Sequence, residues 1–369
     1  MKKTGVAVFG ATGAIGQQFV RFLANNPALD IRIITASRDK IGKRYSDCTS
    51  WYADMSGSGS EIPDSVANMR LSETSVAAVK EVGGVNIVFS ALPSEVSKDL
   101  ESQSAEAGLW VISKASSFRR DPLVPLLVPE VNPSHLKILQ VQRRIKKFSS
   151  NGAIISDPNC TTTGLVLALK PILDNVGIKK VIVTSLQAMS GAGYMGLSPV
   201  SITDNVLPFI VGEETKLRDE TAKIFGKFHN DEIINATFPL YSSCVRVPVD
   251  YGHMEDVYFE TEKECGVDDL KRFMKRFRGE PQELGLPSAP DSPIVVREEE
   301  NRPQPKLDVN TNHGMSVVVG RVREQGEGFR MMLLVHNTVR GGAGMAVLNA
   351  EYLAKKGLTK SPFKESLTA

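Results

Sequence analysis

Cysteine is scarce in this sequence. Only four of the 369 residues are cysteine, and no two of them form a C-x-x-C pair. None lies near histidine at the spacing of a zinc site, so we expect no metal. Secreted domains held by disulfides are dense in cysteine, whereas a long chain with so few is typical of a reducing compartment. The sequence therefore predicts a cytoplasmic protein with free thiols.

Long hydrophobic runs and an excess of one charge are also missing. No apolar run reaches the roughly 18–20 residues that a membrane-spanning helix needs. The formal net charge is +2, which gives no electrostatic basis for binding nucleic acid or an anionic membrane. The start of the chain, MKKTGVAVFG, lacks a small-residue cleavage pattern, and we interpret it as a strand. Neither nucleic acid nor a membrane is an expected partner.

Short β-rich runs alternate with helical stripes in the first part of the chain. The runs cover residues 6–9, 31–37, 85–93 and 109–113. Buried parallel strands have this short apolar character, and alternation with helices indicates a doubly wound sheet. We therefore expect an α/β protein whose N-terminal domain, residues 1–157, is a Rossmann-type dinucleotide-binding domain.

The pattern changes after this point to longer strand-like runs mixed with helices. We expect a helix over 161–175 and helical material over 203–225, followed mostly by strands. This mixture predicts an α+β second domain over residues 158–339. The last segment, 340–369, has a helical pattern that ends at a glycine, and we expect it to pack back on the first domain.

A glycine-rich turn follows the first predicted strand. Gly10–Gly16 has the pattern G-x-x-G-x-x-G between a strand and a helix, where a backbone can approach a pyrophosphate. At the end of the second strand, Ser37 and Arg38 suit a ribose 2′-phosphate, although Asp39 opposes this. We therefore predict NADP (NADPH) in preference to NAD.

One cysteine, Cys160, stands where a loop leads into a helix. A helix N-terminus lowers the pKa of a thiol, and a thiolate can attack an aldehyde. The resulting thiohemiacetal can give hydride to a nicotinamide and become a thioester. Downstream, Arg246 on a strand-like run could hold a carboxylate, and His253 in the turn after it could move the proton.

Taken together, these motifs make the sequence resemble the aspartate-β-semialdehyde dehydrogenases, and the archaeal and fungal type in particular. The stretches SALPSEV, LQAMSGAGYMG, EETKLRDETAKI and HNTVRGGAG extend the likeness over nearly the whole chain. The resemblance implies reversible reductive dephosphorylation of L-4-aspartyl phosphate to L-aspartate 4-semialdehyde. This reaction belongs to lysine, threonine and methionine biosynthesis. It also implies that the second domain is catalytic and dimerising, in a homodimer or homotetramer.

The same resemblance implies a role for each matching position. The catalytic residues would be Cys160 as nucleophile, His253 as general acid/base, Gln187 and Asn159. The substrate would be held by Arg246 (α-carboxylate), Glu213 (ammonium), Lys216 and Arg119 (phosphate). The cofactor would contact Gly10, Thr12, Gly13, Ala14, Ile15, Gly16, Ser37, Arg38, Ser190, Gly191 and Asn337.

Several alternatives stay open at this point. Glu214 competes with Glu213, and Arg120 with Arg119. The stretch SRDKIGK departs from the usual serine-rich pattern, and Lys114 stands where a smaller polar residue is expected. A malonyl-CoA or succinyl-CoA reductase on the same scaffold is the nearest alternative function. A non-catalytic NADP-binding sensor is an alternative of another class.

Overall fold

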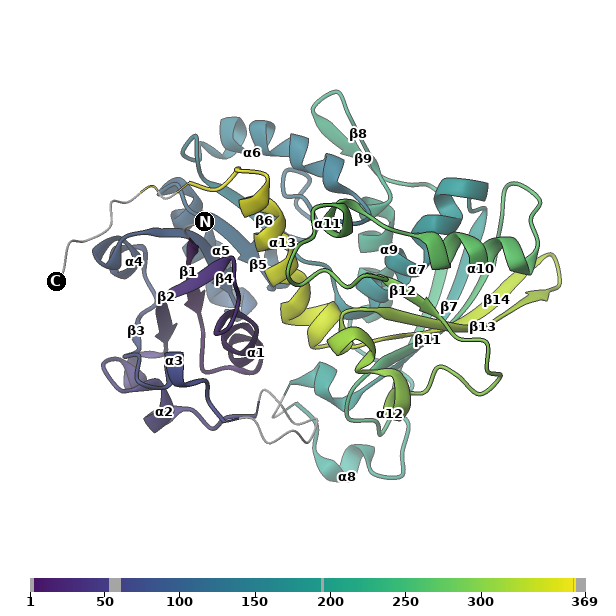
Figure 1. Ribbon diagram of the computed structural model, residues 1–369, viewed down its shortest axis with the longest axis horizontal. Helices are drawn as coiled ribbons and strands as arrows, with labels where there is room; N and C mark the ends of the chain where they lie inside the picture. Colours follow the sequence, from purple (N-terminus) through teal and green to yellow (C-terminus); the bar gives the residue numbers. More distant parts are fainter. Residues whose placement is uncertain (1–2, 53–60, 194–195, 361, 363–369) are drawn as a thin grey trace.

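The computed structural model describes residues 3–52, 61–193, 196–360 and 362. The described chain forms two six-stranded sheets, each with its own helices, and a small two-stranded hairpin. Figure 1 shows the two sheets side by side, with the last helix, α13 (Gly344–Lys355), between them.

The first sheet is entirely parallel, in the order β3-β2-β1-β4-β5-β6. Its strands are β1 (Thr4–Phe9), β2 (Leu29–Ala36), β3 (Ser72–Glu73), β4 (Val85–Ser90), β5 (Trp110–Ser113) and β6 (Ala153–Ser156). Its helices are α1 (Ala14–Leu23), α2 (Tyr45–Cys48), α3 (Asp64–Ala67), α4 (Val76–Val82), α5 (Ser94–Glu106) and α6 (Leu139–Lys146). This order is that of a Rossmann sheet, whose ligand crevice lies at the carboxyl ends of β1 and β4. The predicted fold class is confirmed.

The second sheet is mixed, in the order β10-β7-β11-β14-β13-β12. Its strands are β7 (Lys180–Gln187), β10 (Leu240–Arg246), β11 (His253–Glu260), β12 (Ile294–Val296), β13 (Val317–Gln325) and β14 (Gly328–Val335). Its helices are α7 (Cys160–Val176), α8 (Pro199–Ile202), α9 (Glu213–Ile224), α10 (Val267–Arg276), α11 (Glu280–Glu283) and α12 (Pro305–Asp308), and β8 (Lys227–His229) pairs with β9 (Glu232–Ile234).

Burial alternates along the central strands of the second sheet. In β11 every second residue, starting with His253, is buried, while its neighbours are partly exposed. The buried face shares a core with α7, including Leu165 and Leu169, and Ile182 of β7 faces the other way. One face of this sheet is therefore covered by helices and the other is open, as in many antiparallel sheets.

The helix α13 packs on the first sheet's side of the molecule. Ala346, Val347 and Ala350 belong to the same buried cluster as Phe19 and Val20 of α1. The expected place of the C-terminal segment agrees with this packing for the described residues, whereas residues 361 and 363–369 lie outside them. The exact domain boundaries at 157 and 339 stay a prediction.

The predicted helix over 203–225 is wrong in its first half. Helix α9 begins only at Glu213, and the preceding stretch is irregular. Leu207 instead exchanges two backbone hydrogen bonds with Arg246, of 3.0 and 2.8 Å, at the end of β10. Tertiary pairing thus takes precedence over local helical preference. Among the described residues, no helix combines the length and the apolar character needed to cross a bilayer.

Candidate active site

Cys160 is the first residue of α7, one position earlier than the predicted start of this helix. Asn159 caps the helix, because its Oδ1 accepts hydrogen bonds from the backbone N–H groups of Thr161 (2.9 Å) and Thr162 (3.4 Å). Cys160 therefore lies in the first turn of a 17-residue helix, at the positive end of its dipole.

The turn before α13 covers the cysteine. A Cβ atom built on Gly341 would lie 2.7 Å from the Cβ of Cys160, too close for any side chain. Glycine is therefore required at this position by the close approach of the two backbones. Sequence reasoning missed this neighbour, because 181 positions separate the two residues (341 − 160).

The state of the Cys160 thiol differs from the prediction. Burial, followed by the negative charge of Glu213, raises the pKa of Cys160 to about 11, although Lys114 and Arg119 act to lower it. The predicted lowering of this pKa is therefore wrong for the free protein. The cost of removing water from a thiolate exceeds the benefit of the helix N-terminus. The free protein holds Cys160 as a thiol.

Glu213 connects the residues around Cys160. Its Oε2 accepts hydrogen bonds from Asn159 Nδ2 (2.8 Å) and Gln187 Nε2 (3.3 Å), and its Oε1 accepts one from Lys216 Nζ (2.8 Å). Burial acts to raise the pKa of Glu213, but Lys216 and these hydrogen bonds outweigh it and hold the pKa below its ordinary value. Glu213 is therefore a buried carboxylate that joins Asn159, Gln187 and Lys216.

The neighbouring Glu214 lies elsewhere. Its Oε1 accepts a long hydrogen bond (3.4 Å) from the backbone N–H of Cys244 in β10. Of the two adjacent glutamates, Glu213 is the one that contacts Asn159 and Gln187.

Arg246 and His253 are held by a single residue, Ala188. Arg246 Nη1 donates to the Ala188 carbonyl oxygen (2.7 Å), and the Ala188 N–H donates to His253 Nδ1 (3.0 Å). A Cβ on Gly191 would lie 2.7 Å from Arg246 Nη1 and 3.0 Å from His253 Nε2. The structure thus brings the predicted anion anchor and the predicted acid/base together.

His253 differs from the prediction in place and in state. It opens strand β11 and is fully buried, instead of lying in the turn before it. Burial, then the charge of Arg246, lowers its pKa to about 3, so the ring is neutral at physiological pH. Because Nδ1 accepts from an amide, the neutral ring carries its proton on Nε2. That Nε2 has no partner among the described residues.

Arg119 lies inside the site and Arg120 outside it. Arg119 Nη1 contacts Glu220 Oε1 at 3.2 Å, and Glu220 Oε2 accepts the backbone N–H of Asn159 at 2.6 Å. Arg120 is mostly exposed and pairs with Asp219. Glu220, one more residue that sequence reasoning missed, thus joins Arg119 to the residue before Cys160.

The glycine loop has the geometry of a nucleotide cradle. Gly10 has φ of +75°, and a Cβ on Gly16 would lie 2.1 Å from the Gly10 carbonyl oxygen. Helix α1 begins at Ala14, with Ile15 and Gly16 in its first turn, so its free N–H groups follow the loop directly. Gly10 and Gly16 are therefore needed for this backbone, whereas Gly13 has φ of −80° and space for a Cβ atom. The loop fits a dinucleotide phosphate.

Of the basic residues after β2, Arg38 is exposed and Lys40 is partly buried beside this loop. Ser37 and Arg38 follow the strand, and Lys40 Nζ donates to Thr12 Oγ1 of the loop (3.3 Å). Asp39 is exposed, and a hydrogen bond from Ser37 lowers its pKa. Lys40, which sequence reasoning did not include among the cofactor residues, thus reaches the glycine loop.

The other predicted cofactor residues lie on the histidine side. Asn337 Nδ2 donates to Ser190 Oγ (2.9 Å), and Asn337 Oδ1 accepts the N–H of Gly252, next to His253 (3.0 Å). Gly191 lies against His253, as described above. These three residues therefore form one wall near the histidine.

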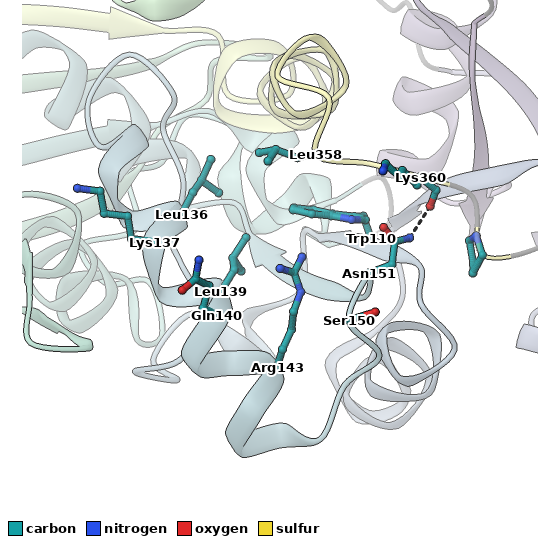
Figure 2. Close-up of a pocket in the computed structure, with 11 residues that line it drawn as sticks. Trp110, Leu136, Lys137, Leu139, Gln140, Arg143, Ser150, Asn151, Leu358 and Lys360 are labelled. Carbon is teal, nitrogen blue, oxygen red and sulfur yellow. Dashed lines mark hydrogen bonds between the residues drawn. The ribbon is translucent and has the colours of Figure 1, made fainter.

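A cavity of about 690 Å³ lies elsewhere, at the amino ends of β5 and β6 (Figure 2). Trp110, Leu139, Arg143 and Lys360 are among its lining residues. Cys160 follows the carboxyl end of β6, so this cavity and Cys160 lie at opposite ends of the strands. Its described lining includes none of the candidate site residues.

Two family models match the chain. The model described as semialdehyde dehydrogenase, NAD binding domain, matches residues 5–139. The model described as semialdehyde dehydrogenase, dimerisation domain, matches residues 169–340. The chain therefore carries a nucleotide-binding and a dimerisation domain.

Named relatives extend over nearly the full length. The aspartate-semialdehyde dehydrogenase of Methanothermobacter thermautotrophicus is 45% identical over 94% of this chain and 98% of its own. That of Schizosaccharomyces pombe is 37% identical over 97% and 99%. A crystal structure of aspartate semialdehyde dehydrogenase with NADP from Candida albicans superposes with a TM-score of 0.86, at 35% identity, over 97% of this chain and 100% of its own. The chain thus belongs to the aspartate-semialdehyde dehydrogenase family.

Proposed function

We propose that the protein reversibly converts L-4-aspartyl phosphate and NADPH into L-aspartate 4-semialdehyde, phosphate and NADP, with Cys160 as the nucleophile. The setting of Cys160 is the observation that carries the proposal. It begins α7, beside the buried Glu213 network and close enough to Arg246 for their charges to interact. Family membership at 45% identity supports the same reaction.

Each step uses a described residue. The Cys160 thiol first gives up its proton to water. The sulfur then bonds to the acyl carbon, the bond from that carbon to the phosphate oxygen breaks, and phosphate leaves a thioester behind. NADPH, when bound, would supply a hydride to this carbon. His253 is suited to donate its Nε2 proton to the acyl oxygen as negative charge develops there. The proton returns when the carbon–sulfur bond breaks and the aldehyde leaves.

The charges of the substrate match an ion pair already present. In the free protein Glu213 and Lys216 neutralise each other at 2.8 Å. The substrate would bring its ammonium to Glu213 and its phosphate to Lys216 and Arg119, so that each residue exchanges one partner for another. Arg246 uses one guanidinium nitrogen, Nη1, in its hydrogen bond to Ala188. Its other N–H groups remain available to bind the α-carboxylate.

NADP is the proposed cofactor because three basic residues follow β2. Arg38, Lys40 and Lys43 surround the point where an acidic residue would select NAD, and Asp39 is the single acid among them. Gly10–Gly16 would hold the pyrophosphate. Ser190, Gly191 and Asn337 would lie at the nicotinamide end, near His253.

The test compares two substrates with the purified protein. Aspartate semialdehyde with phosphate and NADP should give phosphate-dependent NADPH formation, whereas malonyl-CoA with NADPH should give no oxidation. Faster turnover of malonyl-CoA would replace the proposal with a CoA-thioester reductase. NADP binding without either activity would support the sensor function.

We also propose a homodimer formed through the open face of the second sheet. Ile182 and Tyr241 are 43% and 60% exposed on adjacent strands there. A second copy of this face would cover them. Sedimentation of Tyr241→Asp should show monomers where the wild type forms dimers, and a wild-type tetramer would require a second interface.

The free state of all four cysteines supports a cytoplasmic location.

A further inference from the structure

Lys114 is a buried lysine with weak partners. It follows β5 directly, at the carboxyl end of the first sheet, and its side chain is 9% exposed. Its Nζ lies 3.5 Å from Asp157 Oδ2 and 3.4 Å from the Gly341 carbonyl oxygen. Both distances exceed those of strong charge-assisted hydrogen bonds, which are about 2.7–2.9 Å. Lysine is rarely buried unless it is paired, so this loose arrangement needs an explanation.

Both partners of Lys114 lead to Cys160. Asp157 precedes the cysteine by three residues, is fully buried, and accepts a hydrogen bond from Asn349 Nδ2 (2.8 Å). Gly341 is the residue that packs against Cys160. The ammonium of Lys114 therefore lies between the segment that leads to Cys160 and the segment that packs on it.

The charges of Lys114, Asp157 and Cys160 depend on one another. Burial lowers the pKa of Lys114, whereas Asp157 and then the thiolate of Cys160 act to raise it. Burial likewise raises the pKa of Asp157, against the effect of Lys114. Formation of the Cys160 thiolate would thus give the Lys114 ammonium a second negatively charged neighbour besides Asp157.

The other charged and titratable groups around Cys160 are less able to stabilise its thiolate. They are Arg119, Glu213 and Arg246, which interact with its charge, Glu220, which accepts the N–H of Asn159, and His253, which shares Ala188 with Arg246. Arg119 is paired with Glu220 at 3.2 Å, and Glu213 repels a thiolate. His253 is neutral, and Arg246 would be neutralised by the substrate's carboxylate.

We infer that Lys114 supplies the positive charge that stabilises the Cys160 thiolate. It acts through the field at the sulfur and is a positioning residue, while the thiol proton passes to bulk water and Lys114 stays protonated. The inference rests on the proposed nucleophilic role of Cys160. It assigns to a lysine the part that an imidazolium plays in thiol enzymes of the papain kind.

The test measures how fast iodoacetamide alkylates Cys160 between pH 7.5 and 9.5, with peptide mass mapping to separate it from the other three cysteines. In this range the rate follows the thiolate fraction. Lys114→Met should lower the rate about tenfold at every pH, which equals a rise of about one unit in the thiol pKa. Lys114→Arg should stay within about threefold of the wild type.

Lys170→Met is the matched control, because Lys170 lies on the same helix as Cys160 and pairs with Asp174 at 2.7 Å. It should leave the alkylation rate unchanged. Lys114→Gln repeats the test if the methionine variant does not fold, as judged by thermal unfolding and NADP binding. An unchanged rate in a folded neutral variant, or a rate unchanged while the KM for phosphate rises, overturns the inference. Alkylation needs no turnover, so the result is independent of whether the proposed reaction is correct.

Discussion

The two sheets contribute to the site in different ways. The first sheet offers mainly backbone, because Gly10 and Gly16 have no side chains and the helix after them presents N–H groups. The second sheet offers side chains from one buried face, with Arg246 paired to Gln187 in register across β10 and β7. A parallel sheet covered on both faces thus positions a ligand at its edge, whereas a sheet with alternating burial places reactive groups in rows.

One buried acid in each unit, Glu101 and Glu255, can be compared directly. Glu101 of α5 accepts a hydrogen bond from Ser113 Oγ of β5 (2.9 Å). Glu255 of β11, two residues after His253, is fully buried, and neither of its carboxyl oxygens has a partner among the described residues. Glu101 therefore has a hydrogen-bond partner inside its own unit, whereas Glu255 has none among the described residues and lies on the same face of β11 as His253.

The largest expected effect separates chemistry from cofactor binding. Cys160→Ser should reduce turnover by at least about 10⁴-fold, because the nucleophile is lost. NADP affinity, measured by fluorescence titration, should stay close to the wild-type value, since the glycine loop belongs to the other sheet. Appreciable turnover by the serine variant would contradict the thioester mechanism.

The second effect concerns Arg246, which lies on the buried face of the second sheet. Arg246→Leu should lower kcat/KM for aspartate semialdehyde about 10²- to 10³-fold, because a buried charge-assisted contact with the carboxylate is lost. Gln187 and His253 are unchanged in this variant. NADP affinity should therefore stay at the wild-type value. Steady-state kinetics would measure the effect, and an unchanged kcat/KM would remove Arg246 as the anchor.

The third effect compares the two buried acids through stability. Burial raises the pKa of Glu101 to about 7, from 4.5. The folded protein then binds a proton that the unfolded chain releases, so this group's stabilisation is complete below pH 4.5 and is lost as the pH rises towards 7. The loss amounts to about 3 kcal/mol in the free energy of unfolding. Glu101→Gln should remove this pH dependence, as measured by urea unfolding at pH 4.5 and 7.

Glu255→Gln is the companion variant in the second unit. Burial raises the pKa of Glu255 well above its ordinary value, and no hydrogen bond opposes this. Its contribution to stability should therefore also fall as the pH rises, and Glu255→Gln should remove this dependence in the same urea unfolding experiment. A wild-type pH dependence in the Glu255→Gln variant would contradict this.

The smallest effect tests the first sheet alone. Arg38→Ala should raise the KM for NADP about tenfold and leave that for NAD unchanged, because a charged hydrogen bond to the 2′-phosphate is lost. The kcat with saturating NADP should stay near the wild type. Equal changes for both cofactors would show that Arg38 does not read the phosphate.

The sequence predicts the first sheet well and the second less well. Val6–Phe9 and its parallel neighbours are continuous apolar runs, and the glycine loop has a fixed spacing. By contrast, residues 203–212 have a helical pattern but pair with β10 at Leu207, which only the folded chain reveals. Local patterns carry no information on such contacts.

The site shows the same limit. The candidates Cys160, Arg246 and His253 could be chosen by residue type and by resemblance. The thiol's raised pKa and the neutral histidine depend on burial, which cannot be judged from one segment. Lys114 could be noticed as unusual, but its approach to Gly341 joins residues 227 positions apart.

The double attachment at Ala188 has a consequence for variation in this protein. Ala188 holds Arg246, the proposed carboxylate anchor, through its C=O and His253, the proposed proton donor, through its N–H. A shift of this segment would displace both side chains at once. We therefore expect substitutions in the loop that follows Ala188 to change substrate affinity and the rate of chemistry together.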